Sequence, residues 1–541
     1  MQKVRTLVTA LLLLVAVQGV FAVRAKTGWS LMTLTDGTQQ SVLQCGDEWF
    51  HYYLTADGTP MVCQADGRLS AVSWDELRSQ ETASAERRAA ENQRRLQQAR
   101  AYHGDYRLIC ILVDFNDRSF SMPQPQLYYD SLLNQRHCQI EGAMGSVHDY
   151  FYDQSEGQFS IKFDVVGPIH IYQSYKDFSS FFKVQSTLMP DAIHQADELV
   201  DFRTYDWNTD GVVEQVFVLY AGYGANETSD STKNTIWPHE SKLSSRVTVD
   251  SVRCSVYACS NELWADGTLT GIGTMCHELS HCFGLPDLYD VNASESATKT
   301  GGISDAWELM DGGNYNADGW IPAGFSGYEK MACGWLKPVP LTEPTQVSAQ
   351  LPLQEGGDVY AIYNDGHPDE YYLLENRQKI GWDKALPGHG LLITHVDYDR
   401  NKFESNQVNA DTTHFRLVPI PADNNLMSYY YKNRPLRHAA YPYVDQDGTV
   451  LNDSLTNFSV PAASLYHPNV DGSRLMNKCV VNIRETADGN VSFYFSNTPT
   501  TAIHHPSPST HHLSPTYTWG DLRFRRQPDG TYRKYFYREK Q

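Results

Sequence analysis

Basic residues, cysteines and long apolar runs are all scarce in this sequence, and each scarcity excludes a class of protein. The chain has 44 Lys and Arg against 64 Asp and Glu, so its net charge of -20 repels phosphate backbones and argues against nucleic acid as a partner. Ten cysteines in 541 residues are too few for a disulfide framework. Beyond the N-terminus no apolar stretch approaches the ~20 residues of a membrane span, so we expect none in the mature chain.

The N-terminus carries the one long apolar run of the sequence. Its letters, "MQKVRTLVTALLLLVAVQGVFAVRA", place two basic residues first, then the apolar run, then small residues at Ala22 and Ala25. This is the three-part layout of a secretory signal peptide, and the run is short for a membrane anchor. We therefore expect residues 1–25 to be a signal peptide, cleaved after Ala22 or Ala25, and the mature protein to be secreted.

Composition divides the rest of the chain into segments of different character. Short apolar runs alternate with "DG" turns over residues 27–75, which predicts antiparallel hairpins. Residues 76–102 are rich in Ala, Glu, Gln and Arg without an apolar stripe, the pattern of an exposed helical connector that proteases can reach. Residues 498–512 are rich in Pro, Ser and Thr, as linkers are, and a short basic tail follows them.

Between the connector and the linker, the pattern changes from mixed helices and strands to strands alone. Residues 106–115 and 214–222 have the pattern of apolar strands. The letters between them predict a helix at "GSVHDYFYDQS", a strand pair near "FSIKFDVVGPIHI" and an amphipathic helix at "TLMPDAIHQADELVDF". From residue 341 onward, strand signals such as "EYYLLENR" and "GLLITHVDYD" come without helices.

The stretch "CHELSHCFGLPDLYD", residues 276–290, carries the strongest chemical signal. Residues 269–284 can form a helix, on which His277 and His281 lie one turn apart on one face and can bind one metal ion. Glu278 lies about 100° further round the helix, where it cannot share their geometry as a ligand but can reach a water on the metal.

The end of this helix can supply a third ligand. Gly284 permits a tight turn and Pro286 forbids further helix, so the chain can fold back and offer Asp287. Two neutral nitrogens and one carboxylate suit Zn²⁺ and leave its fourth position open for water, as catalytic rather than structural sites require. The alternative is a polar helix end that spells the motif by accident, but a chance match that also supplies this glycine and this acid is rare.

The same stretch resembles that of a known family. "HELSHCFGLPDLYD", followed by "WELMDGGNY", is similar to the M6 family of secreted bacterial metallopeptidases, the immune inhibitor A type, which are zincins close to the metzincins. The likeness includes "LICILVDF", "GSVHDYFYDQSEGQFSIKFDVVGPI" and "YYLLENRQKIGWDKALPGHGLLITHVD", and it spans most of residues 30–495. The resemblance implies zinc on His277, His281 and Asp287, with Glu278 as the general base.

The resemblance also implies that Met310 lies in the turn beneath the metal. A core methionine would have the same pattern, and the two interpretations are compatible. Metzincins often place a tyrosine two residues after this methionine, but Gly312 stands at that position here. Tyr315, Tyr328 and a backbone donor therefore stay open as the group that stabilises the oxyanion.

Together the patterns and the resemblance imply an α/β (α+β) fold: a zincin-like catalytic domain with an N-terminal propeptide unit and a β-rich C-terminal domain. The expected segments are a signal peptide (1–25), a propeptide and helical connector (26–104), a zincin-like metallopeptidase domain (105–340), a β-rich C-terminal domain (341–497), and a linker with a basic tail (498–541).

A second metal signal is "DWNTDGVVE". It places Asp206, Asn208 and Asp210 at positions 1, 3 and 5 of a calcium-loop pattern, with glycine at position 6. Position 12 would be Phe217, which cannot ligate, so Glu214 or another segment must complete the shell. We expect a structural Ca²⁺ here, and the alternative is a plain Asx turn.

The leading functional hypothesis is a secreted zinc endopeptidase, made as a zymogen, monomeric, and acting on proteins or peptides. The alternative is an exported binding or adhesion protein whose zincin domain is an inert scaffold. Glu278 discriminates between them, because a scaffold has no physical need for a carboxylate beside two ligand histidines.

Latency requires a block over the zinc position, and residues 26 to about 104 are placed to provide it. Cys45 or Cys63 could offer a thiolate as the fourth zinc ligand, but the two are also spaced for a disulfide across a hairpin. We favour the disulfide, with steric occlusion or a propeptide carboxylate covering the metal. Cys254 and Cys259 are also close enough in sequence to pair.

Overall fold

The computed structural model describes residues 20–21, 23–26, 28–47, 50–64, 66–81, 102–227, 236–291, 303–426 and 436–499, together with three strands of the C-terminal tail. The chain divides into two units, Met1–Thr500 and Thr501–Gln541. Helices and strands are mixed in the larger unit, so the predicted α/β class is confirmed. Among the residues described, no helix has the length and apolar character to cross a membrane.

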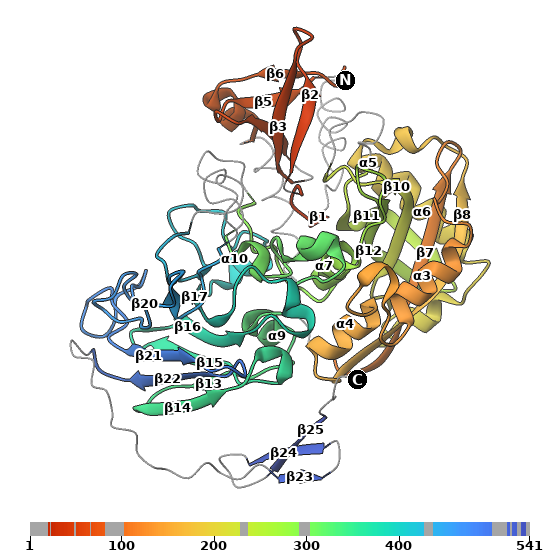
Figure 1. The fold of residues 1–541 in the computed structure, drawn as a ribbon. Coiled ribbons are helices and arrows are strands. Elements are labelled where there is room, and N and C mark those ends of the chain that lie inside the picture. Colours follow the sequence, from red (N-terminus) through yellow and green to blue (C-terminus); the bar gives the residue numbers. More distant parts are fainter. Residues whose placement is uncertain are drawn as a thin grey trace, which may run out of the picture. The chain divides into compact units, whose positions relative to one another are not determined.

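The largest sheet has seven strands in the order β1-β11-β12-β10-β7-β8, with β9 beside β12 (Figure 1). Strands β12, β10, β7 and β8 run parallel, whereas β11 is antiparallel to β12 and β1 is antiparallel to β11. Every residue from Val216 to Ala221 is buried, as expected of a central strand that is covered on both faces. The bounds are β1 Val20–Phe21, β7 Gly104–Phe115, β8 Phe159–Ile171, β9 Val212–Val213, β10 Val216–Tyr223, β11 His239–Val249 and β12 Val252–Leu263.

Helices cover both faces of this sheet (Figure 1). Successive strand residues point to opposite faces of the sheet, so side chains of β7 pack in two hydrophobic cores, one on each face. Leu108 and Leu112 pack with α3, α4 and α7, while Ile109 and Ile111 pack with α6. The helices are α3 Pro125–Asn134, α4 Val147–Gln154, α6 Met189–Ala196 and α7 Gly273–Cys282. Shorter helical segments are η1 Ile140–Gly142, η2 Tyr175–Phe178, α5 Phe181–Lys183, η3 Val184–Leu188, η4 Phe202–Tyr205, η5 Asp305–Trp307, η6 Gly313–Gly319, α9 Gly327–Ala332, η7 Leu353–Glu355, η8 Gly381–Ala385 and α10 Arg400–Glu404.

Two predicted elements of this region differ from the structure. The strand pair expected over residues 159–171 is one continuous strand, β8. Gly167 adopts a φ of +98° where a Cβ would lie 2.6 Å from the Leu112 carbonyl oxygen, and the register with β7 shifts there, so the glycine marks an irregularity rather than a turn. The amphipathic helix is also shorter than predicted, because it ends at Ala196 and a new turn, capped by Asp201, begins at Phe202.

Residues 29–71 form a five-stranded antiparallel sheet whose strands follow sequence order. Its strands are β2 Trp29–Thr33, β3 Gln39–Gly46, β4 His51–Thr55, β5 Pro60–Cys63 and β6 Leu69–Ala71. Residues 74–81 are helical, and the rest of the predicted connector, 82–101, lies outside the described residues.

The predicted disulfides are wrong, because all ten cysteines are free thiols. Cys45 lies on β3 and Cys63 on β5, with β4 between them, and strands two places apart in a sheet are separated by about 10 Å. Cys254 and Cys259 lie on the same strand, β12, where five residues span about 17 Å. Both separations exceed disulfide reach.

Residues 339–496 contain three further sheets. A five-stranded sheet has the order β13-β15-β16-β17-β18, a three-stranded sheet has the order β14-β22-β21, and β19 pairs with β20. Three short helical segments, η7, η8 and α10, interrupt the expected run of strands. Asp399 caps α10 by accepting hydrogen bonds from two backbone N–H groups. The bounds are β13 Val339–Pro340, β14 Thr345–Gln350, β15 Tyr360–Asn364, β16 His367–Arg377, β17 Gly390–Asp397, β18 Leu417–Pro419, β19 Tyr443–Val444, β20 Val450–Asn452, β21 Cys479–Glu485 and β22 Val491–Ser496.

The smaller unit contains an antiparallel sheet of three strands, β23 Tyr517–Trp519, β24 Leu522–Arg526 and β25 Tyr532–Phe536. The linker predicted before it lies mostly outside the described residues.

Candidate functional site

Helix α7 brings two buried histidines together. His277 and His281 lie one turn apart, and their Nε2 atoms are 3.1 Å from each other. Each Nδ1 is hydrogen-bonded to a backbone carbonyl, that of Leu309 at 2.9 Å for His277 and that of Leu285 at 2.8 Å for His281. Because a carbonyl can only accept, each Nδ1 carries a proton, which leaves Nε2 as the nitrogen of each ring that could bind a metal ion.

The turn after α7 brings Asp287 to the same point. Gly284 adopts a φ of +91°, a left-handed conformation that allows the tight turn expected there. Asp287 Oδ1 then lies 3.2 Å from His277 Nε2 and 3.3 Å from His281 Nε2. Asn406 fixes this orientation by donating from Nδ2 to Asp287 Oδ2 at 2.7 Å and accepting the Asp287 N–H at Oδ1 at 2.6 Å. The three predicted ligands therefore converge, with their ligand atoms within 4.8 Å of one another.

The chemistry of this group fits a bound cation. Asp287 Oδ1 is buried and accepts no hydrogen bond, and it faces two imidazole lone pairs. Burial lowers the pKa of His277, which keeps its ring neutral. Burial alone would raise the pKa of Asp287, but the two adjacent histidines outweigh it and hold that pKa below its ordinary value. Two imidazole nitrogens and one carboxylate oxygen, all buried and directed at one point, form a ligand set that suits a metal ion such as Zn²⁺.

Glu278 lies beside the three ligand residues and contacts the N-terminal segment. Its Oε1 accepts a hydrogen bond from the Val23 backbone N–H at 2.9 Å. The side chain is fully buried, and burial raises the pKa of Glu278 well above 4.5. The Glu278 carboxylate thus contacts the chain at Val23 and interacts electrostatically with Asp287.

The residues around Val23 run along the edge of the large sheet. Strand β1 pairs antiparallel with β11, with Phe21 opposite Glu240. The Val23 carbonyl then accepts a hydrogen bond from Trp237 Nε1 at 2.7 Å, and the Lys26 N–H donates to the Asn226 carbonyl at 2.8 Å. The segment is thus bound as an extended peptide is bound at a sheet edge.

Arg24 fills an acidic recess next to the site. Its guanidinium lies 2.7 Å from Asp305 Oδ1 and 3.3 Å from Asp311 Oδ1, and all three side chains are buried. A Cβ at Gly312 would lie 2.0 Å from the Arg24 Nη2, so a side chain there would displace the arginine. Burial raises the pKa of Asp311 to about 6, although the charge of Arg24 opposes that shift.

The methionine and the two tyrosines singled out by the sequence occupy different places. Met310 is fully buried, and its carbonyl accepts the Leu288 N–H at 2.8 Å. Tyr315 donates from its hydroxyl to the Arg24 carbonyl at 2.5 Å, so it contacts the N-terminal segment. Tyr328 instead packs in the core, with its ring 5.4 Å from that of Phe403.

Sequence reasoning missed the residues that reach this site from distant segments. Asn406 lies 119 residues beyond Asp287, and Arg24 pairs with Asp305 across 281 residues. No local pattern identifies such partners, because only the folded chain brings them together.

In the predicted calcium loop, the expected ligand side chains accept hydrogen bonds from the loop's own backbone. Asp206 accepts the N–H groups of Asp210 and Gly211 at 3.1 and 2.8 Å, and Glu214 accepts that of Trp207 at 2.6 Å. Asn208 Oδ1 also accepts the Asp210 N–H. These are Asx-turn contacts, and the converging groups of metal-ligating side chains found among the described residues do not include this loop.

Comparison with known families identifies the segment that holds the site. Residues 107–336 match the model of the immune inhibitor A peptidase M6 catalytic domain, which confirms the resemblance predicted from the sequence. No curated protein matches the chain. The matched segment includes His277, Glu278, His281 and Asp287. Residues 107–336 thus match the catalytic domain of the immune inhibitor A peptidase M6 family, and that match implies a metallopeptidase, a hydrolase that acts on peptide bonds.

Proposed function

We propose that the protein is a secreted, monomeric, zinc-dependent endopeptidase with a zincin-like catalytic domain, made as a zymogen and active on proteins or peptides. The observation that carries the proposal is the convergence of His277, His281 and Asp287 beside Glu278, inside the segment that matches an M6 peptidase. An inert scaffold would not need a buried carboxylate at this point, where it costs free energy of burial.

The zinc ion would be held by His277, His281 and Asp287, and when bound it would supply a Lewis acid for the scissile carbonyl and lower the pKa of an attacking water. Glu278 is the general base: its carboxylate accepts the proton of the water and delivers it to the leaving amine nitrogen. The Leu309 and Leu285 carbonyls hold the imidazoles in the tautomer that ligation requires. Strand β11 orients an extended substrate through main-chain hydrogen bonds, as it does the chain at Val20 and Phe21.

Latency is proposed to reside in residues 23–26 rather than in a cysteine or a propeptide carboxylate. The Val23 N–H engages Glu278, and Arg24 is locked in its recess, so a substrate cannot take the same path. Burial raises the pKa of the Cys45 thiol to about 12, which keeps it protonated and a poor metal ligand. The segment blocks the site only if the signal peptide is cleaved after Ala22, because cleavage after Ala25 removes Val23 and Arg24.

The calcium site at residues 206–214 stays a prediction. It is proposed as structural, with Asp206, Asn208, Asp210 and Glu214 as the oxygen donors.

Two chains that differ by three residues test this proposal. One begins at Val23 and the other at Lys26, each released from a cleavable N-terminal fusion and loaded with zinc. We expect hydrolysis of an unfolded protein by the second chain, inhibited by a chelator and restored by zinc, and a much slower rate for the first. Absence of chelator-sensitive hydrolysis from both chains would contradict the peptidase assignment, and equal rates would contradict the blocking role of residues 23–25.

A further inference from the structure

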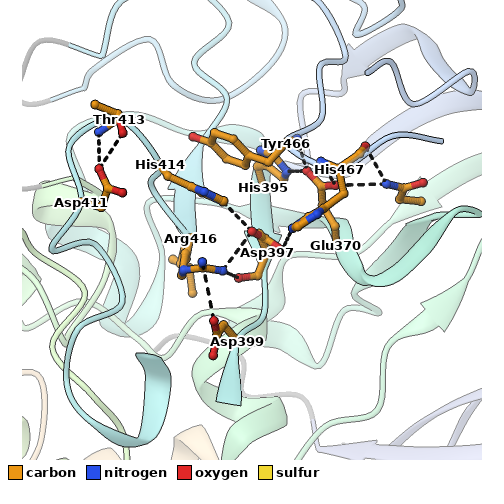
Figure 2. Close-up of polar contacts among 12 residues, drawn as sticks. Glu370, His395, Asp397, Asp399, Asp411, Thr413, His414, Arg416, Tyr466 and His467 are labelled. Atoms are coloured by element: carbon orange, nitrogen blue, oxygen red, sulfur yellow. Dashed lines mark hydrogen bonds and ion pairs between the residues drawn. The ribbon is translucent and has the colours of Figure 1, made fainter. Parts of the chain in front are cut away.

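A second group of potential ligands lies far from α7, in the C-terminal sheets. His367 begins β16, Asp397 ends β17, and His467 lies between β20 and β21. Their ligand atoms all lie within 4.8 Å of one another. Figure 2 shows His467 and His414 both directed at the Asp397 carboxylate. This group shares no residue with the α7 site.

The two oxygens of the Asp397 carboxylate have different surroundings: one is hydrogen-bonded to other side chains, and the other faces His467. Oδ2 accepts hydrogen bonds from His414 Nε2 at 2.5 Å and Arg416 Nη1 at 3.0 Å (Figure 2). Oδ1 is buried and accepts no hydrogen bond, and the nearest cationic or ligating atom recorded for it is His467 Nε2 at 3.3 Å. Metal-ligating carboxylates have this arrangement, because outer partners fix one oxygen and leave the other for the ion.

The two histidines complete the donor set and keep it accessible. Their ring centroids are 4.0 Å apart, and both side chains are half-buried, so an ion can enter from solvent. Two imidazoles and one carboxylate match the ligands that Zn²⁺ and similar divalent transition metals prefer.

Glu370 holds the loop that carries His467 in place. Its carboxylate accepts the N–H groups of Tyr466 and His467 at 2.5 and 3.0 Å and the His395 Nε2–H at 2.9 Å (Figure 2). The Asn364 side chain also donates to the His467 carbonyl. The position of His467 is therefore fixed before any ion binds.

The charges around the group favour a cation. Asp397, Glu370 and Asp399 contribute three negative charges, and Arg416 contributes one positive charge while bridging Asp397 and Asp399. His414 and His395 are the other titratable groups that touch these carboxylates. The surroundings therefore carry a net negative charge when His414 and His395 are neutral.

We propose that His367, Asp397 and His467 bind a second divalent transition metal of the Zn²⁺ type, with water completing its shell. The ion ties residues 453–478, a long connection without regular strands or helices, to the β16–β17 hairpin. Connections longer than about 15 residues without secondary structure are uncommon in compact domains, and many of them are functional. The proposal does not depend on catalysis at α7.

Metal counting in the whole chain tests the second site. In a His277→Ala/His281→Ala background, which removes the α7 ligands, we expect one Zn²⁺ per chain after dialysis, measured by atomic spectroscopy, and a melting temperature that rises when Zn²⁺ is added. Adding His467→Ala should abolish the bound ion or weaken its affinity by more than about 100-fold, because even an outer-shell change costs roughly 10–100-fold. His389→Ala is the matched control, since this half-exposed histidine pairs with Glu485 outside the group.

Three results would overturn the proposal: no Zn²⁺ in the His277→Ala/His281→Ala chain, equal Zn²⁺ content after His467→Ala and His389→Ala, or no thermal shift with Zn²⁺. If His467→Ala does not fold, His367→Asn at the start of a hairpin strand provides the same comparison. Its melting temperature without metal should match that of the background chain, and its Zn²⁺ content should fall.

Discussion

The backbone N–H of Val23 donates a hydrogen bond to Glu278 Oε1 at 2.9 Å, across 255 residues of sequence. The two residues join the region predicted to be removed on export to the centre of the peptidase domain. A chain that begins at Val23 after signal cleavage would present its α-amine to the proposed general base. The N-terminal segment thus occupies the path proposed for a substrate, along β11 and past Glu278.

Arg24→Ala, in the chain that begins at Val23, should increase peptide hydrolysis. The substitution leaves Asp305 and Asp311 buried without their cation. Breaking a buried ion pair in this way costs about 3–5 kcal/mol. We expect much of this cost to weaken the binding of the N-terminal segment to the site. Arg68→Ala is the control, because its pair with Asp66 is exposed and belongs to the same N-terminal region. Equal rates for both variants and the parent would show that Arg24 does not hold the block.

The recess that holds Arg24 should also select substrates. If a substrate follows the path of residues 20–26, the second residue after the scissile bond reaches Asp305 and Asp311. We expect peptides with Arg at this position to have a higher kcat/KM than those with Ala, and Asp311→Asn to reduce the ratio between them. A peptide library cleaved without preference at this position would contradict the shared path.

Asp287→Ala should weaken zinc affinity strongly at the α7 site, whereas Asp290→Ala should not. Asp287 Oδ1 lies within 3.3 Å of both imidazole nitrogens, and loss of one of three protein ligands removes a large part of the binding free energy. His281→Ala should likewise lose the ion. Competition with a zinc-binding dye measures the affinities, and the reverse ranking of the two aspartates would assign the ligand to Asp290.

Millimolar Ca²⁺ should raise the melting temperature if the loop at residues 206–214 binds it, because a ligand of the folded state stabilises that state. The double variant Asp206→Ala/Asp210→Ala should lose the rise. Mg²⁺ at the same concentration controls for ionic strength. If Ca²⁺ does not change the melting temperature of the parent chain, the loop is only a set of Asx turns, as its hydrogen bonds already indicate.

Local rules explain which parts of the site were predictable. The helical period places His277 and His281 on one face, and Gly284 with Pro286 reverses the chain so that Asp287 joins them. All three relations lie within eleven residues, and the structure brings the three side chains together as expected.

Long-range relations were not predictable in the same way. The spacing of Cys45 and Cys63 fits a hairpin, but the disulfide failed because the intervening strand β4 lies between them in the sheet. The recess for Arg24 depends on Asp305 and Asp311, which approach it only through the tertiary fold. The prediction of a strand pair at residues 159–171 was wrong because Gly167 and Pro168 have the composition of a turn. In the structure β8 continues through them, and its register with β7 shifts instead.

Hydrolysis by Glu278→Gln tests the central claim most directly. The variant is made in the zinc-loaded chain that begins at Lys26, and its zinc content is measured beside its rate on an unfolded protein. We predict zinc content equal to that of the parent and a rate lower by roughly 10²–10⁴-fold, because the substitution removes the proton acceptor and no ligand. Hydrolysis at the parent rate, with zinc still bound, would contradict the account.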